Sequence, residues 1–174
     1  MPNIPKPKIG IVGLGMVGEP LKRYFETKGF KRGNNLFCYD ADPAKNYSDD
    51  VGKAEIVFVA VPTPSKKDGS CDTGIVESVV KKLAKTAETI VVKSTVTPGT
   101  VEILAKKYKC PVIFNPEFLT ESHAWENTIF PDRQIVAASL GVRVAAAAIL
   151  NLLPPASFSA PRHKKAENWT EMNP

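Results

Sequence analysis

The sequence predicts an α/β protein with a doubly wound, mainly parallel six-stranded sheet and flanking helices. Short apolar runs alternate with helical patterns along the first 140 residues. Several of these runs are continuous and β-branched, as expected for strands that are covered on both faces. Each helical pattern lies between two apolar runs, which indicates βαβ units with right-handed crossovers. Numbered along the chain, the strands are predicted to lie in the order 3-2-1-4-5-6.

The elements are predicted in order along the chain. Strands are expected at Lys8–Val12, Asn35–Tyr39, Ile56–Ala60, Thr89–Val92, Val112–Phe114 and Gln134–Ala137. Helices are expected at Gly18–Lys28, Thr73–Ala84 and Gly99–Lys107. An Ala-rich helix is expected over Val142–Leu153, where Pro154-Pro155 ends it because proline cannot continue a helix. A short strand at Ser157–Ala160 and the start of a helix over Lys164–Met172 complete the prediction.

Composition bounds the class of protein. The 174 residues are 43% hydrophobic and 24% charged, which suits one globular domain and excludes a disordered, collagenous or coiled-coil chain. The net charge is +5, and basic residues occur in scattered pairs along the chain. Scattered pairs are typical of solvated surfaces, so no nucleic-acid partner is expected.

Cysteine usage and apolar runs indicate the cellular environment. Cys38, Cys71 and Cys110 form no Cys-x-x-Cys pair and are odd in number, which favours reduced thiols in a cytoplasmic protein. The N-terminus lacks the apolar core of a signal peptide. The run Val144–Leu150 is too short to span a bilayer. The two histidines have no second ligand at helical spacing, so no metal site is expected.

The strongest local signal is a glycine-rich turn between the first strand and the first helix. Gly13 would allow a tight turn, Gly15 would let a pyrophosphate approach the backbone, and Gly18 would let helix and strand pack closely. The helix N-terminus adds N–H groups and the positive end of its dipole. The turn therefore predicts a Rossmann-like fold that binds a dinucleotide through Gly13, Leu14, Gly15, Met16, Val17 and Gly18.

An acidic residue at the end of the second strand supports the same prediction. Asp40 lies 22 residues beyond Gly18, close to the spacing at which such proteins place a carboxylate on the adenosine ribose. Its charge would repel the 2′-phosphate of NADP, so NAD is the predicted cofactor. The alternative is that Asp40 only caps a turn.

Three further segments follow the ends of later strands, where ligands of doubly wound sheets bind. They are Ala60-Val61-Pro62-Thr63-Pro64-Ser65, Lys93-Ser94-Thr95-Val96-Thr97-Pro98-Gly99 and Asn115-Pro116-Glu117-Phe118-Leu119-Thr120-Glu121. From the residues alone, the first two are either rigid proline turns or ligand-binding loops.

Taken in this order with the glycine turn, these segments resemble the UDP-glucose/GDP-mannose dehydrogenase family from about Lys8 to Ala137. Members oxidise the C6 alcohol of a nucleotide sugar to a carboxylate with two NAD. The resemblance implies that NAD also touches Asp40, Lys45, Val61, Pro62, Thr63, Pro64, Ser65, Ser94, Thr95, Val96 and Glu121. It implies that the sugar touches Glu117, Phe118, Leu119, Thr120 and Glu121. Thr95 and Glu117 are the implied catalytic residues, because they are similar to those that position a water and assist hydrolysis of the acyl-enzyme.

The sequence departs from the family pattern at three points. Ser122 stands where the family usually has glycine, and Thr170 stands where a catalytic lysine would follow Ala166-Glu167. No cysteine lies in a glycine-rich segment like that of the family nucleophile. We therefore expect residues 1–140 to be the NAD-binding Rossmann domain and residues 141–174 to be a C-terminal helix and tail, the start of a missing central, substrate-binding region. The expected partner is a nucleotide sugar of the UDP-glucose type, with self-association left open.

Two other interpretations stay open. A 3-hydroxyacid dehydrogenase of the hydroxyisobutyrate type would share the glycine turn and the Ser-Thr strand end, although the Val-Pro-Thr-Pro and Asn-Pro-Glu-Phe-Leu segments fit it poorly. A stand-alone, non-enzymatic NAD-binding module would explain the missing cysteine and lysine. Assays with UDP-glucose, GDP-mannose and 3-hydroxyisobutyrate separate the two enzymes, and a partner pull-down addresses the module.

Overall fold

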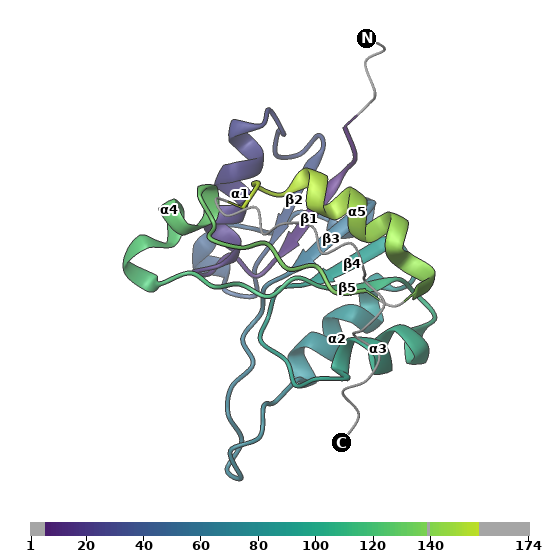
Figure 1. The fold of residues 1–174 in the computed structure, drawn as a ribbon. Coiled ribbons are helices and arrows are strands. Elements are labelled where there is room, and N and C mark those ends of the chain that lie inside the picture. Colours follow the sequence, from purple (N-terminus) through teal and green to yellow (C-terminus); the bar gives the residue numbers. More distant parts are fainter. Residues whose placement is uncertain (1–5, 139, 157–174) are drawn as a thin grey trace, which may run out of the picture.

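A parallel sheet lies at the centre of the computed structural model, which describes residues 6–138 and 140–156 (Figure 1). In this part of the chain the sheet has five strands in the order β2-β1-β3-β4-β5. The strands are β1 (Ile9–Val12), β2 (Leu36–Tyr39), β3 (Ile56–Val59), β4 (Thr89–Val92) and β5 (Val112–Phe114). Because each pairing is parallel, the carboxyl ends of the strands share one edge. The predicted α/β fold with a parallel sheet is confirmed.

The predicted strand order was wrong. It placed the third strand beside the second, whereas β3 pairs with β1. Two short 3-10 helices, η1 (Pro43–Lys45) and η2 (Val51–Lys53), connect β2 to β3 in place of a long helix. η2 contacts both β1 and β2, and Val51 packs against the apolar cluster on that face. The connection therefore runs across the face of β1 and delivers β3 to its other side.

The predicted sixth strand, Gln134–Ala137, is not a strand. Within the described residues it contributes one isolated antiparallel bridge, between Ala137 and Phe114. The Asn115 side chain donates hydrogen bonds to the Ile135 carbonyl at 2.8 Å and to Gln134 Oε1 at 3.3 Å. The Asn115 side chain thus occupies the Ile135 carbonyl, which could otherwise pair with a neighbouring strand. The described sheet ends at β5.

Helices cover both faces of the sheet (Figure 1). The four predicted helices are confirmed within one residue at each end, while α4 and the short 3-10 helices were not predicted. The expected strand at Ser157–Ala160 and helix over Lys164–Met172 lie outside the described residues. One face carries α2 (Gly74–Leu83) and α3 (Thr100–Tyr108), and the other carries α1 (Gly18–Thr27), α4 (Ala124–Ile129) and α5 (Arg143–Leu152).

Two apolar clusters, one on each face, hold the strands in place. Successive side chains of a strand point to opposite faces, so Ile11 packs with α1 while Val12 packs with α2. The rings of Phe25 and Phe58 lie 5.5 Å apart between α1 and β3. Ile149 of α5 is fully buried in the same cluster. The strand ends that carry the candidate site are therefore anchored by packing on both faces.

Candidate functional site

A cavity of about 650 Å³ lies at the carboxyl ends of the central strands. It brings together the turn after β1, the segment after β2 and the loops after β3 and β4. The predicted cofactor residues that line it are Gly13, Gly15, Met16, Val17, Asp40, Lys45, Val61, Pro62, Thr63, Ser94 and Thr95. The predicted residues that do not line it are Leu14, Gly18, Pro64, Ser65, Val96 and Glu121.

The three glycines of the turn after β1 differ in what surrounds them. Gly13 has a φ of +91°, and a Cβ there would overlap the Ala60 carbonyl. A Cβ at Gly18 would overlap the Gly13 carbonyl oxygen. By contrast, no described atom lies within 4 Å of the Cβ position of Gly15, which faces the cavity. The turn thus needs glycine for packing at its two ends and leaves open space at its middle.

The N-terminus of α1 is suited to an anion. Val17 occupies the cap position, and no described side chain caps it. Backbone N–H groups at such an end are unpaired within the helix and lie at the positive end of its dipole. The open space at Gly15 lies beside this helix end, so a pyrophosphate fits both the charge and the space.

The Asp40 carboxylate ties three segments of the cavity wall together. Its Oδ2 accepts hydrogen bonds from Leu14 N–H at 2.6 Å and Lys45 Nζ at 3.0 Å, and its Oδ1 accepts one from Asp42 N–H at 2.9 Å. Burial raises the pKa of this carboxyl, but the hydrogen bonds from Asp42, Leu14 and Lys45 outweigh burial and hold the pKa below its ordinary value. Asp40 is therefore an ionised acceptor at neutral pH.

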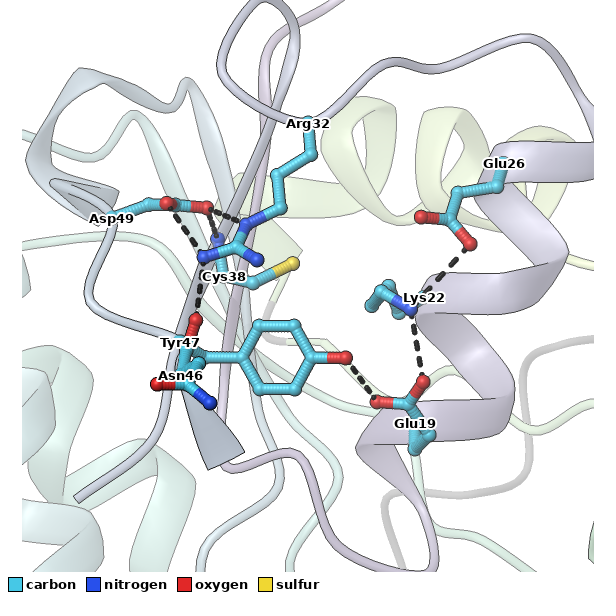
Figure 2. Close-up of polar contacts among 8 residues, drawn as sticks. All are labelled: Glu19, Lys22, Glu26, Arg32, Cys38, Asn46, Tyr47 and Asp49. Carbon is cyan, nitrogen blue, oxygen red and sulfur yellow. Dashed lines mark hydrogen bonds and ion pairs between the residues drawn. The ribbon is translucent and has the colours of Figure 1, made fainter. Parts of the chain in front are cut away.

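A polar network supports the segment that follows Asp40 (Figure 2). Arg32 donates to both oxygens of Asp49, at 2.8 and 3.0 Å, and stacks over the Tyr47 ring at 4.8 Å. Tyr47 Oη donates to Glu19 Oε2 at 3.0 Å, and Lys22 pairs with Glu19 at 2.9 Å. The network therefore joins the segment after β2 to the first turn of α1.

The Arg32–Asp49 pair is expected to make stability depend on pH. The Arg32 guanidinium lowers the pKa of the Asp49 carboxyl, against an opposing effect of burial. Because the folded-state pKa lies below the unfolded value of about 3.9, the pair stabilises the fold above that pH and loses its effect as the pH falls. Arg32→Met should destabilise the protein by about 1 kcal/mol at pH 7 and by less at pH 3.

Urea denaturation of the wild type and Arg32→Met at both pH values measures this difference. Lys31→Met is the matched control, since Lys31 is an exposed neighbour that forms no ion pair among residues 6–138 and 140–156. An equal loss of stability at pH 3 and pH 7 would contradict the electrostatic assignment.

The ends of β4 and β5 carry a buried ion pair that the sequence analysis missed. Lys93 Nζ lies 2.9 Å from Glu117 Oε2 and 2.8 Å from Asn115 Oδ1, and the Lys93 side chain is 2% exposed. Burial lowers the pKa of the Lys93 ammonium, and the charge of Glu117 offsets part of that effect. The available signal was a lysine directly after an apolar strand, beside Ser94 and Thr95.

The two predicted catalytic residues lie at the ends of adjacent strands but line different cavities. Thr95 is exposed and faces the larger cavity. Glu117 lines a second cavity of about 340 Å³ with Phe118, Leu119, Asn127 and Arg133 among its other wall residues. Of the remaining predicted sugar-contacting residues, Thr120 bonds Asn127 and Glu121 begins a short 3-10 helix. The structure thus places Glu117, Phe118 and Leu119 together at the smaller cavity and Thr95 at the larger one.

Neither a metal site nor a membrane span is found in residues 6–138 and 140–156. No group of at least 3 His, Cys, Asp or Glu side chains there could hold a metal ion. Each described helix is too short or too polar to cross a bilayer. The three cysteines are free thiols; Cys38 and Cys110 are buried, and burial raises the pKa of Cys38 to about 12.

The parallel sheet, glycine turn and Asp40 define a dinucleotide-binding module of the Rossmann class. The family model for "UDP-glucose/GDP-mannose dehydrogenase family, NAD binding domain" matches residues 42–148. The chain therefore belongs to the UDP-glucose/GDP-mannose dehydrogenase family and carries its NAD-binding domain. The glycine turn and Asp40 precede the matched segment.

Individual relatives agree with the family assignment. The UDP-glucose 6-dehydrogenase of Rickettsia typhi is 39% identical over 101 residues, which are 53% of this chain and 23% of the relative. The structure of a Pyrobaculum islandicum UDP-glucose dehydrogenase is similar with a TM-score of 0.75 and 25% identity, over 90% of this chain and 46% of the other. A Pseudomonas aeruginosa GDP-mannose dehydrogenase shares the fold at a TM-score of 0.69 and 23% identity, over 86% of this chain and 45% of the other. The chain spans less than half the length of these relatives.

Proposed function

We propose that the chain is the NAD-binding portion of a nucleotide-sugar 6-dehydrogenase of the UDP-glucose type. The observation that carries the proposal is the cavity in which the Gly13–Gly18 turn, Asp40 and the loops after β3 and β4 meet. NAD, when bound, would accept hydride from the sugar C6. The side chains of this chain would bind and orient the two reactants.

The cofactor residues are grouped by the part of NAD that each would bind. The Gly13–Gly18 turn would hold the pyrophosphate, while Asp40 and Lys45 would hold the adenosine ribose. The nicotinamide half would lie against Val61, Pro62, Thr63, Pro64, Ser65, Ser94, Thr95, Val96 and Glu121. A hydrogen bond of 2.7 Å from Ser94 Oγ to the Val61 carbonyl fixes the spacing of these two loops, which supports this half of the proposal.

The substrate residues follow β5. Glu117, Phe118, Leu119, Thr120 and Glu121 would touch the sugar of a nucleotide-sugar substrate. We also assign Thr95 and Glu117, at the ends of the adjacent strands β4 and β5, to the water that hydrolyses the acyl-enzyme. Because Thr95 lines the larger cavity and Glu117 the smaller one, that water would have to lie between the two. Residues 1–140 would form the NAD-binding domain, and residues 141–174 would begin the central region. We place the protein in the cytoplasm, which agrees with its three free thiols. Self-association of the chain stays an open part of the proposal.

The substrate assignment is tested by amide chemical shifts in the NAD-saturated chain. UDP-glucose should shift the amide signals of residues 117–121, whereas 3-hydroxyisobutyrate should leave them in place. Shifts with 3-hydroxyisobutyrate alone would favour the 3-hydroxyacid dehydrogenase interpretation. A chain that binds NAD and responds to neither compound would favour the stand-alone module.

The 174-residue chain by itself is expected to bind NAD without reducing it. Oxidation to the acid needs a thiolate beside the sugar C6 to capture the aldehyde, and a donor for the developing oxyanion, worth about 3–4 kcal/mol elsewhere. Cys38 and Cys110 are buried in the apolar clusters. Cys71 lies in the loop after β3, where its thiol donates a hydrogen bond to the Thr95 carbonyl at 3.5 Å, away from the cavity that Glu117 lines. Incubation with NAD and UDP-glucose should therefore give no increase in NADH absorbance.

Turnover would contradict this prediction in one of two ways. NADH formation that is abolished by replacing one of the three cysteines would identify a chain thiol as the nucleophile. NADH formation that survives all three replacements would contradict a covalent mechanism.

A further inference from the structure

The buried ion pair at the ends of β4 and β5 calls for an explanation beyond packing. Lys93 is 2% exposed at its side chain, and Asn115 is fully buried. The Asn115 amide oxygen accepts from Lys93, while its nitrogen donates to the Ile135 carbonyl. Asn115 thus holds the lysine from one side, and its own orientation is fixed by the segment after α4.

Stability alone does not explain such a pair. Removing an ammonium and a carboxylate from water carries a desolvation penalty that their attraction often does not repay, so an apolar pair of similar size packs as well or better. A buried charge beside a cleft is instead typical of functional sites. Lys93 occupies that position, since Ser94 and Thr95 line the larger cavity and its partner Glu117 lines the smaller one.

Glu117 lies between the buried ammonium and the smaller cavity. Its side chain is 20% exposed, Oε2 faces Lys93, and Oε1 accepts from Phe118 N–H at 3.0 Å. A carboxylate offers about four lone-pair positions, and these two donors leave acceptor capacity for a ligand or water. The carboxylate is therefore held by two donors and still able to accept further hydrogen bonds.

We propose that Lys93 is a positioning residue for Glu117, holding that carboxylate in a fixed orientation at the wall of the smaller cavity. The proposal deepens the proposed function, because the use of the carboxylate rests on the role assigned to Glu117 there. Lys93 itself would touch neither cofactor nor sugar. Its effect would be to keep Glu117 an acceptor for a water or hydroxyl proton.

Other charged groups line the smaller cavity with Glu117. They are Asp132 and Arg133, and the Arg133 guanidinium lies 5.1 Å from the centre of the Phe118 ring. Arg133 is exposed, so water screens its charge, whereas the Lys93 ammonium is shielded from water. Among the described residues, Lys93 is the cation that forms an ion pair with Glu117.

Two NMR measurements on the 174-residue chain test the proposal. The first is the ¹⁵Nζ titration of Lys93: because Glu117 offsets part of the effect of burial, the pKa of Lys93 should fall further in Glu117→Gln. The second is the amide signal of Phe118, whose N–H donates to Glu117 Oε1; Lys93→Met should shift this signal, and Lys93→Arg should keep it near the wild-type position. Lys106→Met is the matched control, because Lys106 is an exposed lysine on α3 and should leave the Phe118 amide signal unchanged.

An unchanged Phe118 amide signal in Lys93→Met, or an unchanged Lys93 titration in Glu117→Gln, would overturn the proposal. If Lys93→Met does not fold, the Lys93 titration in Glu117→Gln decides alone. NAD calorimetry on the wild type tests the proposed function separately. Absence of NAD binding there would reject the proposed function, while the two NMR measurements would still decide the role of Lys93.

Discussion

Replacing Gly18 by alanine is expected to destabilise the fold by about 3 kcal/mol or more and to abolish measurable NAD binding. The added Cβ would overlap the Gly13 carbonyl oxygen, with the Ile11 side chain 3.5 Å away. These are atoms of the turn and of β1, which cannot move without disturbing the sheet. Urea denaturation and calorimetry with NAD measure the two effects.

Gly15→Ala is the matched control for Gly18→Ala, because it adds the same methyl group in the same turn. The Gly15 Cβ position has no described atom within 4 Å, and Gly15 is absent from the glycines with positive φ, so stability should change by less than about 0.5 kcal/mol. The methyl group would occupy the space through which a pyrophosphate approaches the backbone, so NAD affinity should fall at least about tenfold. Wild-type NAD affinity in Gly15→Ala would show that the cofactor does not lie along this turn.

Asp40→Ala is expected to weaken NAD binding about 10- to 150-fold. The reason is the loss of charge-assisted hydrogen bonding to the ribose diol, worth about 1.5–3 kcal/mol in total. The variant also frees Leu14 N–H and Lys45 from their shared acceptor. Since no carboxylate would remain to repel a 2′-phosphate, NADP should bind the variant relatively better than it binds the wild type.

Calorimetry with NAD and NADP on the wild type and the variant gives the four affinities. Asp68→Ala is the control, because it removes one acidic side chain from the exposed loop after β3. Equal affinity of the wild type for NAD and NADP would reject the assignment of Asp40 to the ribose, as would an Asp40→Ala variant that binds NAD like the wild type.

Local patterns were sufficient to predict helices α1, α2, α3 and α5, the five described strands and the glycine turn. The buried face of each main helix repeats at helical spacing, as with Leu21 and Phe25 of α1. Continuous apolar runs such as Thr89–Val92 identified strands buried on both faces. Asp40 was predictable because it follows a strand at a fixed distance from the glycines. Each of these features depends on neighbours in the sequence.

The strand order and the sheet edge depended on contacts between distant residues. The position of β3 beside β1 follows from η2 packing over β1 and β2, and η2 is only three residues long. The loss of the sixth strand follows from Asn115, whose side chain bonds the Ile135 carbonyl 20 residues later. The apolar pattern around Gln134–Ala137 gives no sign that a distant side chain bonds this segment.

Lys93 shows the same limit within the candidate site. A lysine at a strand end usually indicates a solvated side chain, so the sequence position of Lys93 gave no sign of its burial. Its burial results from Asn115 and Glu117 on the following strand and loop, at sequence separations of 22 residues and more. The Lys93–Glu117 ion pair could therefore be identified only from the structure, in which β4 and β5 are neighbours.

A crystal structure of the 174-residue chain with NAD tests the account most directly. The account predicts the pyrophosphate over the Gly13–Gly18 turn, beside Gly15, and the adenosine ribose hydroxyls on the Asp40 carboxylate. The nicotinamide should lie toward Ser94 and Thr95. Difference density for NAD elsewhere on the molecule, or a ribose bound away from Asp40, would contradict the account.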